Sequence, residues 1–181
     1  MSWQVEGGNS DRIPKEINRR RQRAEIIDVA EKQLGLVVMQ LSSAHFAFPI
    51  EQVVQVLPVQ PISHLPGTPK HVVGMIQVRG VVESVVDLRH FLGMTPLKKV
   101  ERGQVLLLSA HGLRTGVLID GMRDIIHLPV SAIHPPGADL SEALQEIVVG
   151  ELSGQEGPVH LLNVEMILQK ISDFQVTPNF G

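Results

Sequence analysis

From Leu36 onward, the sequence is a series of short apolar runs separated by glycine, proline and polar residues. The runs recur roughly every 8–12 residues, which is typical of an all-β barrel or sandwich and unlike an alternating βαβ fold. Phe46, Phe48 and Ile50 alternate with other residues and are predicted to share one face of a strand. The expected strands span residues 36–41, 45–50, 52–57, 72–78, 81–87, 104–109, 115–119, 121–127, 147–152 and 159–162.

The composition limits both the core and the chemistry of the chain. Hydrophobic residues make up 43% of the 181 residues, but aromatic residues make up only 3% and tyrosine is absent. Valine, isoleucine and leucine must therefore fill the core, and β-branched residues favour strands. The absence of cysteine excludes disulfides, thiolate catalysis, iron–sulfur clusters and zinc ribbons. A net charge of −3 argues against a generally basic nucleic-acid-binding protein.

Glycine positions predict tight turns between several of these strands. Hairpins are expected at Arg79-Gly80, near His111-Gly112 and near residues 154–157, because glycine adopts the positive φ that such turns require. Residues 163–171 are predicted to form a C-terminal helix capped by Asn163. Two strands end in similar sequences, Val-Val-Asp at Asp87 and Leu-Ile-Asp at Asp120, which suggests two small barrels side by side. A barrel of that size is marginal alone, so a shared core is expected.

The N-terminal part of the chain differs from the rest in charge and pattern. Residues 11–34 have helical spacing, with Asp11 as a possible N-cap and Gly35 as the stop. Residues 1–35 carry seven Lys and Arg and six Asp and Glu, whereas the remainder carries nine and thirteen. This extension is either a docking helix for an acidic partner, nucleic acid or anionic lipid, or a solvated amphipathic helix. No signal peptide or membrane span is expected, which favours a cytoplasmic protein.

A search for catalytic chemistry finds little. The eight histidines show no metal-binding spacing, and no nucleophile elbow, P-loop or dinucleotide motif is present. Asp87 and Asp120 could form an acid–base dyad, but neither lies in an Asp-Thr-Gly or Asp-Ser-Gly context, so a structural role at the strand ends is favoured. We therefore expect no enzyme activity, cofactor or metal. Arg79, at a hairpin tip between Val78 and Val81, is the best candidate interface residue.

Several motifs resemble those of the CheW-type chemotaxis coupling proteins. The most specific stretch is Gly74 to Gly80, followed by Val85 to Arg89 and by Leu92-Gly93, which resembles the family pattern G-x-x-N-x-R-G…V-x-D-L-R…L-G. Gln77 stands where the family usually has Asn, and Asn163 where Asp is common. Further matches are Phe48-Pro49-Ile50 with Val53 and Val56, Leu65-Pro66, Gly116 to Asp120, Gly150, and Leu161 to Asn163.

The resemblance implies a fold and a role. The fold would be two five-stranded SH3-like β-barrels in residues 35–172, preceded by the charged helical extension 1–34 and followed by a flexible tail, 173–181. The function would be a non-catalytic adaptor in the cytoplasm, recruited to membrane-associated chemoreceptor arrays. It would couple the cytoplasmic tip of a methyl-accepting chemoreceptor to the regulatory domain of a CheA-type histidine kinase, without binding nucleic acid or inserting into the membrane.

The resemblance also implies roles for individual residues, and two alternative functions remain open. Partner contact would involve Arg79 with Val78 and Gly80. Weaker candidates are Val53, Val56 and Met75, whereas Gly74, Asp87 and Asp120 are expected at turns or strand ends. One alternative is an interaction module of the same fold that serves pilus motility or another two-component output. A distant alternative is an aspartate-dependent hydrolase.

Overall fold

The computed structural model describes residues 31–98 and 100–175, and most of this part of the chain is β structure. All ten predicted strands are confirmed, with ends that agree to within three residues. The strands are β1 (Gln33–Leu41), β2 (Ala44–Pro49), β3 (Val53–Pro58), β4 (Val72–Val78), β5 (Val81–Val86), β6 (Gln104–Ala110), β7 (Leu113–Ile119), β8 (Gly121–Pro129), β9 (Val148–Gly154) and β10 (Gly157–Leu162). The helices are η1 (Ile50–Gln52), η2 (Leu88–His90), η3 (Val130–Ala132), α2 (Glu142–Gln145) and α3 (Val164–Gln175).

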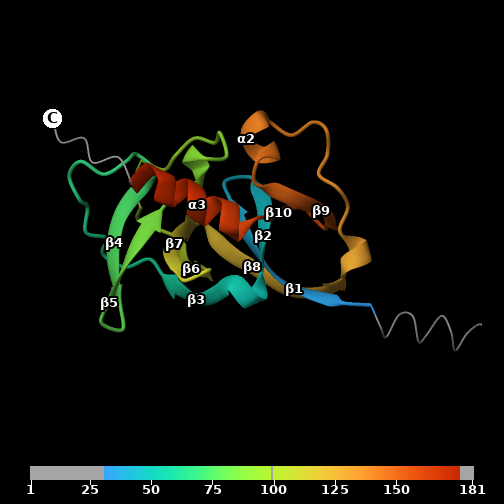
Figure 1. The fold of residues 1–181 in the computed structure, drawn as a ribbon, viewed down its shortest axis with the longest axis horizontal. Coiled ribbons are helices and arrows are strands. Elements are labelled where there is room, and N and C mark those ends of the chain that lie inside the picture. Colours follow the sequence, from blue (N-terminus) through green and yellow to red (C-terminus); the bar gives the residue numbers. More distant parts are fainter. Residues whose placement is uncertain (1–30, 99, 176–181) are drawn as a thin grey trace, which may run out of the picture. The chain divides into compact units, whose positions relative to one another are not determined.

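The strands form two mixed five-stranded sheets, drawn side by side in Figure 1. The first sheet has the order β8-β1-β2-β10-β9, and the second has the order β3-β6-β7-β5-β4. One parallel pair lies inside each sheet, β2 with β10 in the first and β5 with β7 in the second. The two sheets therefore have the same internal plan.

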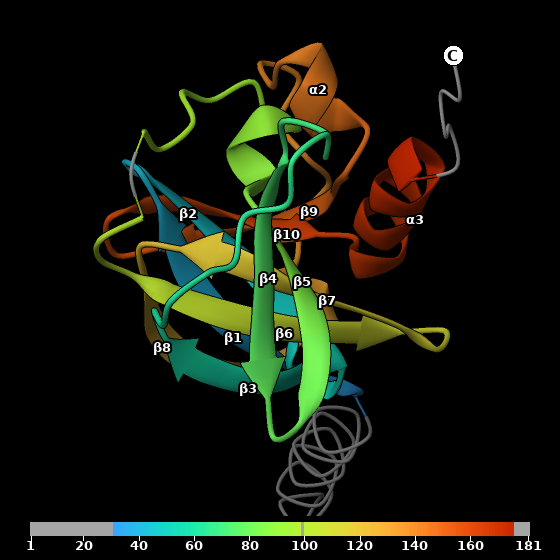
Figure 2. The ribbon, with the colours of Figure 1, turned by 90° about the vertical axis from the view of Figure 1, so that its left-hand side faces the viewer.

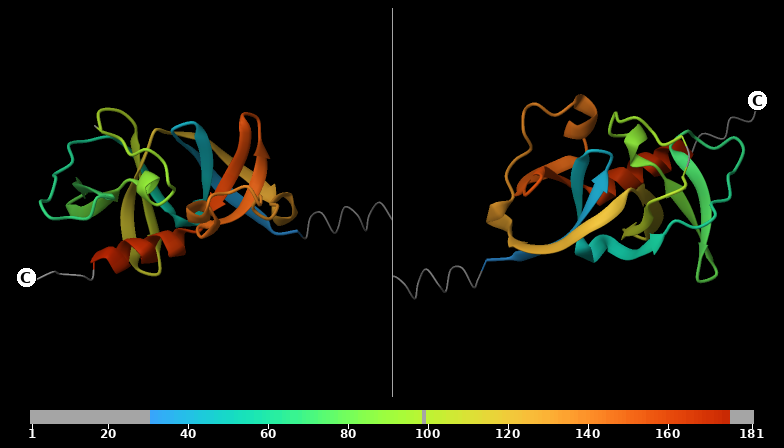
Figure 3. Two further views of the ribbon diagram at one scale, coloured as in Figure 1. Left: turned by 90° about the horizontal axis from the view of Figure 1, so that it is seen from above. Right: turned by 180° about the vertical axis from the view of Figure 1, so that it is seen from behind.

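The second sheet is inserted in sequence between the two parts of the first. The chain places β1 and β2 in the first sheet, β3 to β7 in the second, and β8 to β10 back in the first. The colours of Figure 3 show this division of the first sheet, because the blue N-terminal strands lie beside the orange C-terminal ones. The first sheet is consequently complete only when strands from both ends of the described chain have come together.

A short bridge connects the two edges of each sheet. In the first sheet, His134, which follows the edge strand β8, exchanges two backbone hydrogen bonds of 2.8 Å with Glu151 in the opposite edge strand, β9. In the second sheet, Ser63, which follows β3, exchanges two of 2.9 Å with Met75 in β4. Both sheets are therefore curled, each with an inner and an outer face.

The internal repeat differs from the one that the sequence suggested. By position in their sheets, β5 corresponds to β10 and β7 corresponds to β2. Asp87, which follows β5, accepts a hydrogen bond from the backbone of η2, and Asn163, which follows β10, accepts one from the backbone of α3. Asp87 is thus equivalent to Asn163. The predicted equivalence of Asp87 and Asp120 is wrong, because Asp120 follows β7.

The largest core cluster lies between the two sheets. It combines Phe46 and Phe48 of the first sheet with Leu106 and Leu108 of the second, all at most 1% exposed. The helix α3 contributes Ile167 to the same cluster and packs on β6 and β7 (Figure 2). Smaller clusters fill the inner face of each sheet. This arrangement provides the shared core that two small lobes require.

Three local expectations need correction or completion. Ile50 does not continue the buried face of β2, because it begins η1 and is 38% exposed. The helix predicted over residues 11–34 lies mainly outside the described residues, and its last two, Gln33 and Leu34, belong to β1. The predicted helix capped by Asn163 is confirmed but continues to Gln175, past the expected start of the tail.

No helix in the described ranges is long and apolar enough to cross a membrane.

Candidate functional site

The hairpin of β4 and β5 carries the strongest predicted interface residue. Val78 pairs with Val81, so Arg79 and Gly80 form a two-residue turn. Their φ angles are +50° and +83°, as a turn of type I′ requires at both central positions. The turn lies at the end of a hairpin that projects from the second sheet, which places Arg79 in solvent (Figures 1 and 2).

Two consecutive valines extend this exposed surface along β5. Val81 is 53% exposed and Val82 is 61% exposed, the highest value among the large apolar side chains of the described residues. Neighbouring side chains on a strand point to opposite faces, so the hairpin presents apolar atoms on both sides of its tip. Adjacent exposed apolar groups beside an arginine are typical of a protein interface. We call Arg79, Val81 and Val82 the hairpin surface.

The other predicted interface residues are less accessible. Val78 is 8% exposed and belongs to the inner core of the second sheet. Val53 and Val56 are half-buried against the core between the sheets, and Met75 is half-buried on β4. Gly80 is exposed in the turn itself. Only Arg79 and Gly80 of the six predicted residues therefore present an open surface.

Gly74 lies within β4 rather than at its end. A side chain at this position would place a Cβ atom 2.5 Å from the carbonyl oxygen of Ser63. Glycine is therefore required by the bridge between Ser63 and Met75, which brings the two backbones close together.

A buried arginine anchors the chain at the end of β5. Arg89 is 0% exposed, and its Nη1 donates to Asp87 Oδ1 at 3.0 Å while its Nη2 donates to Asp120 Oδ1 at 2.8 Å. Its Nε lies 3.4 Å from Ser42 Oγ, in the turn between β1 and β2. Asp87 also accepts from the backbone N–H groups of Arg89 and Leu97. The guanidinium therefore connects three segments, two from the second sheet and one from the first.

This anchor gives Asp87 and Asp120 a structural explanation. The two carboxylates are brought together by the structure, but both contact the guanidinium group of Arg89 and not each other. Each accepts a hydrogen bond from the Arg89 guanidinium, which lies between them, whereas a general acid–base dyad shares a proton between its two carboxyl groups. Sequence reasoning missed Arg89 because arginine is rarely fully buried, although the Asp-Leu-Arg spacing was visible.

Nothing in the described part of the chain resembles a metal centre. No group of three or more His, Asp or Glu side chains is placed to hold a metal ion among residues 31–98 and 100–175. The most unusual histidine is His71, which is 5% exposed and packs against the ring of Phe91 with centroids 4.8 Å apart. Burial, and secondarily the neighbouring His90, lowers the pKa of His71 below its ordinary value of 6.5.

Comparison with known proteins identifies the family. The family model described as CheW-like domain matches residues 35–172. The chain belongs to the CheW family. It is 23% identical over 148 residues to a chemotaxis protein CheW from Bacillus subtilis, which covers 80% of this chain and 92% of that protein. It is 30% identical over 122 residues to Protein FrzA from Myxococcus xanthus, which covers 67% of this chain and 76% of the relative.

A solved CheW structure has the same fold. The scaffolding protein TtCheW from Thermoanaerobacter tengcongensis superposes with a TM-score of 0.64 at 21% identity, covering 74% of this chain and 90% of that one. CheW-family proteins are non-catalytic scaffolds in chemotaxis-type signal transduction, so the predictions of a scaffold and of no enzyme activity are confirmed by family membership.

Proposed function

We propose that this CheW-family scaffold couples the cytoplasmic tip of a chemoreceptor to the regulatory domain of a CheA-type histidine kinase, in the cytoplasm at receptor arrays. We further infer that its two curled sheets act as a pair of SH3-like barrels, which the bridges His134–Glu151 and Ser63–Met75 support. A scaffold needs rigid surfaces more than a pocket, and the core between the sheets holds the two lobes together.

The hairpin surface is the single observation that carries the proposal. Arg79 is exposed on a turn whose backbone conformation the strand pairing fixes, and Val81 and Val82 expose apolar area beside it. A surface that is ordered before binding loses little conformational entropy when a partner docks. Val78, buried beneath the tip, then acts by supporting the turn, and Val53, Val56 and Met75 act by shaping the lobe.

The substitution Arg79→Ala tests this role. We expect the affinity for a CheA-type regulatory domain or for a chemoreceptor tip to fall at least about fivefold, as for an interface residue that contributes more than about 1 kcal/mol. The thermal midpoint should stay unchanged, because the side chain is exposed. Arg102→Ala, at another exposed arginine, is the matched control and should bind normally. Unfolding of the Arg79 variant, or normal binding by it, would reject the hairpin surface as the contact.

The same fold could serve another output, and relatives with different names, CheW and FrzA, give this alternative its support. A module for pilus motility or another two-component output would use the charged N-terminal residues to choose its partner. Deletion of residues 1–30 tests this, because the deletion leaves β1 intact. Retention of the same partners by the shortened chain would argue that these residues do not determine partner choice.

A further inference from the structure

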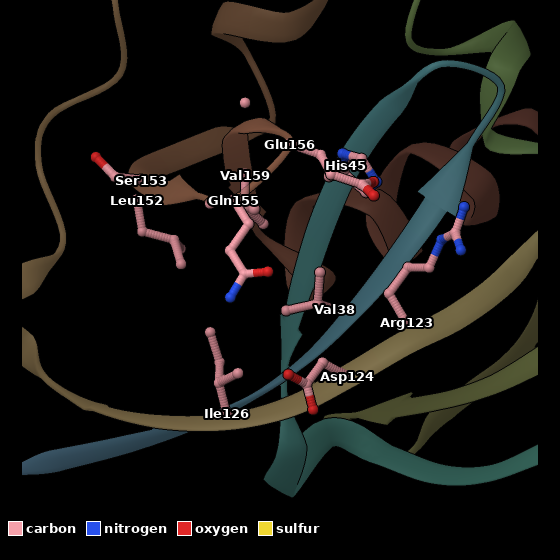
Figure 4. A pocket seen from close by; sticks show the side chains of 12 residues that line it. Val38, His45, Arg123, Asp124, Ile126, Leu152, Ser153, Gln155, Glu156 and Val159 are labelled. Carbon is pink, nitrogen blue, oxygen red and sulfur yellow. The ribbon is translucent and has the colours of Figure 1, made fainter.

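A cavity opens at one end of the inner face of the first sheet. Its volume is about 430 Å³, within the range of about 300–1,000 Å³ of typical ligand pockets, and mouths of curled sheets are frequent ligand sites. Figure 4 shows Val38, Leu152 and Ile126 around the cavity, and Val159 completes its apolar lining. All four belong to the apolar cluster on the inner face of this sheet.

The second sheet carries different side chains at the equivalent place. Leu161 pairs with Ala47 in the first sheet as Val85 pairs with Gly116 in the second. Two residues earlier along each strand, the side chains face the same way. These positions hold Val159 and His45 in the first sheet, and Glu83 and Arg114 in the second.

In the second sheet, this pair is an ion pair. Glu83 is 5% exposed, and its Oε1 lies 2.9 Å from Nη2 of Arg114, whose side chain is 42% exposed. The first sheet has valine where the second has glutamate, and histidine where the second has arginine. The two sheets therefore place different side chains at this point of the inner face, and the cavity lies beside the smaller pair.

Carboxylates predominate among the charged groups around the open mouth. Asp124 lies two residues before Ile126 on β8 and so shares its face, and Glu156 lies in the turn between β9 and β10. His45 Nε2 is 3.3 Å from Glu156 Oε2. Arg123 is the one cation among the lining residues, and its Nη2 donates to Gln40 Oε1. Figure 4 shows Glu156 beside His45 and Asp124 across the cavity from them.

We propose that this cavity binds an aliphatic cation. The alkyl part, about four carbons as in lysine and arginine side chains, packs on Val38, Leu152 and Val159. The ammonium or guanidinium group lies at the mouth, where Asp124 and Glu156 accept its hydrogen bonds. The chemistry is the same for a free amine and for an arginine or lysine side chain presented by a polypeptide. The site is separate from the hairpin surface and stands whether or not the proposed partners are correct.

Calorimetric titration of the full chain with n-butylguanidine, a four-carbon alkyl chain that ends in one guanidinium group, tests the site. Butylguanidine should bind saturably, and pentanoate, which has the same alkyl chain but the opposite charge, should not. Asp124→Asn and Glu156→Gln should each weaken butylguanidine binding about tenfold, as expected for loss of one charge-assisted hydrogen bond. Asp139→Asn removes an exposed carboxylate outside the cavity and should change nothing.

A second variant places the residue pair of the second sheet in the first. His45→Arg combined with Val159→Glu replaces two lining residues of the cavity with larger side chains and should abolish butylguanidine binding. Circular dichroism establishes whether this variant folds, and the variants of Asp124 and Glu156 keep the test decisive if it does not. Absence of butylguanidine binding, equal binding of pentanoate, or unchanged binding by both of those variants would overturn the proposal.

Competition distinguishes the two sources of the cation. A peptide with the sequence of residues 17–25 contains four arginines and serves as the polypeptide probe. Displacement of butylguanidine by this peptide would assign the site to an arginine side chain. Saturable butylguanidine binding that the peptide does not displace would assign it to a small free cation.

Discussion

Replacement of Arg89 by methionine is the most informative perturbation of the buried anchor. Methionine fills a similar volume but removes the guanidinium, which donates to Asp87 and Asp120 and is fully buried. Asp87, whose side chain is 4% exposed, would then be a buried carboxylate without a counter-charge. Asp120 is 34% exposed and can be solvated instead.

The expected loss of stability follows from this asymmetry. Removal of one partner from a buried ion pair costs about 3–5 kcal/mol. Asp87 keeps the backbone N–H groups of Arg89 and Leu97 as donors, at 3.1 and 3.3 Å, so the low end of that range applies. We expect a loss of about 3 kcal/mol, which corresponds to a decrease of roughly 6–12 °C in the thermal midpoint for a chain of this size.

Urea unfolding followed by circular dichroism measures this loss. The decisive comparison adds Asp87→Asn to the Arg89→Met variant, because this second substitution removes the charge that had lost its partner. The double variant should be more stable than Arg89→Met alone. Arg102→Met, at an exposed arginine, is the matched control and should stay within about 0.5 kcal/mol of the native chain.

Two results would refute the reasoning. An Arg89→Met variant as stable as the native chain would mean that the buried guanidinium contributes nothing to stability. A further loss on adding Asp87→Asn would mean that an unpartnered carboxylate is not the origin of the cost.

Two further predictions concern the helix cap and the buried histidine. Asn163→Ala should lower the free energy of unfolding by about 1 kcal/mol in urea, because Asn163 Oδ1 caps α3 by accepting from Met166 N at 3.1 Å. Asn163→Asp should retain this stability, and an unchanged alanine variant would contradict the role of the cap. Because the folded chain lowers the pKa of His71, the unfolded chain binds its proton more readily, so this contribution to stability is lost as pH falls below 6.5. His71→Gln should reduce the slope of unfolding free energy between pH 7 and 5, and exposed His64→Gln should not; equal slopes in both variants would contradict the assignment.

The strands could be predicted because their signal is local. Apolar alternation marks a strand, and residue pairs such as Arg79-Gly80 mark the turns. The insertion of the second sheet between the two parts of the first could not be predicted, because periodicity shows that β3 is a strand but not which strand lies beside it. The apparent repeat at Asp87 and Asp120 was misleading for the same reason, since only sheet position shows that Asn163 is the equivalent of Asp87.

The sites were less accessible to sequence reasoning. The exposure of Val82 could not be predicted, because the adjacent valines Val85 and Val86 of the same strand are both fully buried, one on each face of the sheet. Arg89 could not be found either, since its charge predicts exposure and its burial depends on carboxylates from two distant segments. The cavity of the first sheet was equally hidden, because it depends on which side chain each sheet places opposite His45 and Arg114.

The division of the first sheet in sequence also has a consequence for how the chain folds during synthesis. The hairpin of β1 and β2 is made before the whole second sheet, and its neighbours β8 and β10 are made after it. At about 5–20 residues per second, the delay of roughly 110 residues between β2 and β10 lasts about 5–20 s. During the first half of this time, Phe46 and Phe48 also lack Leu106 and Leu108, their core partners from the second sheet. Such long-range contacts give a high contact order, so slow folding and a need for chaperone protection of the nascent chain are expected.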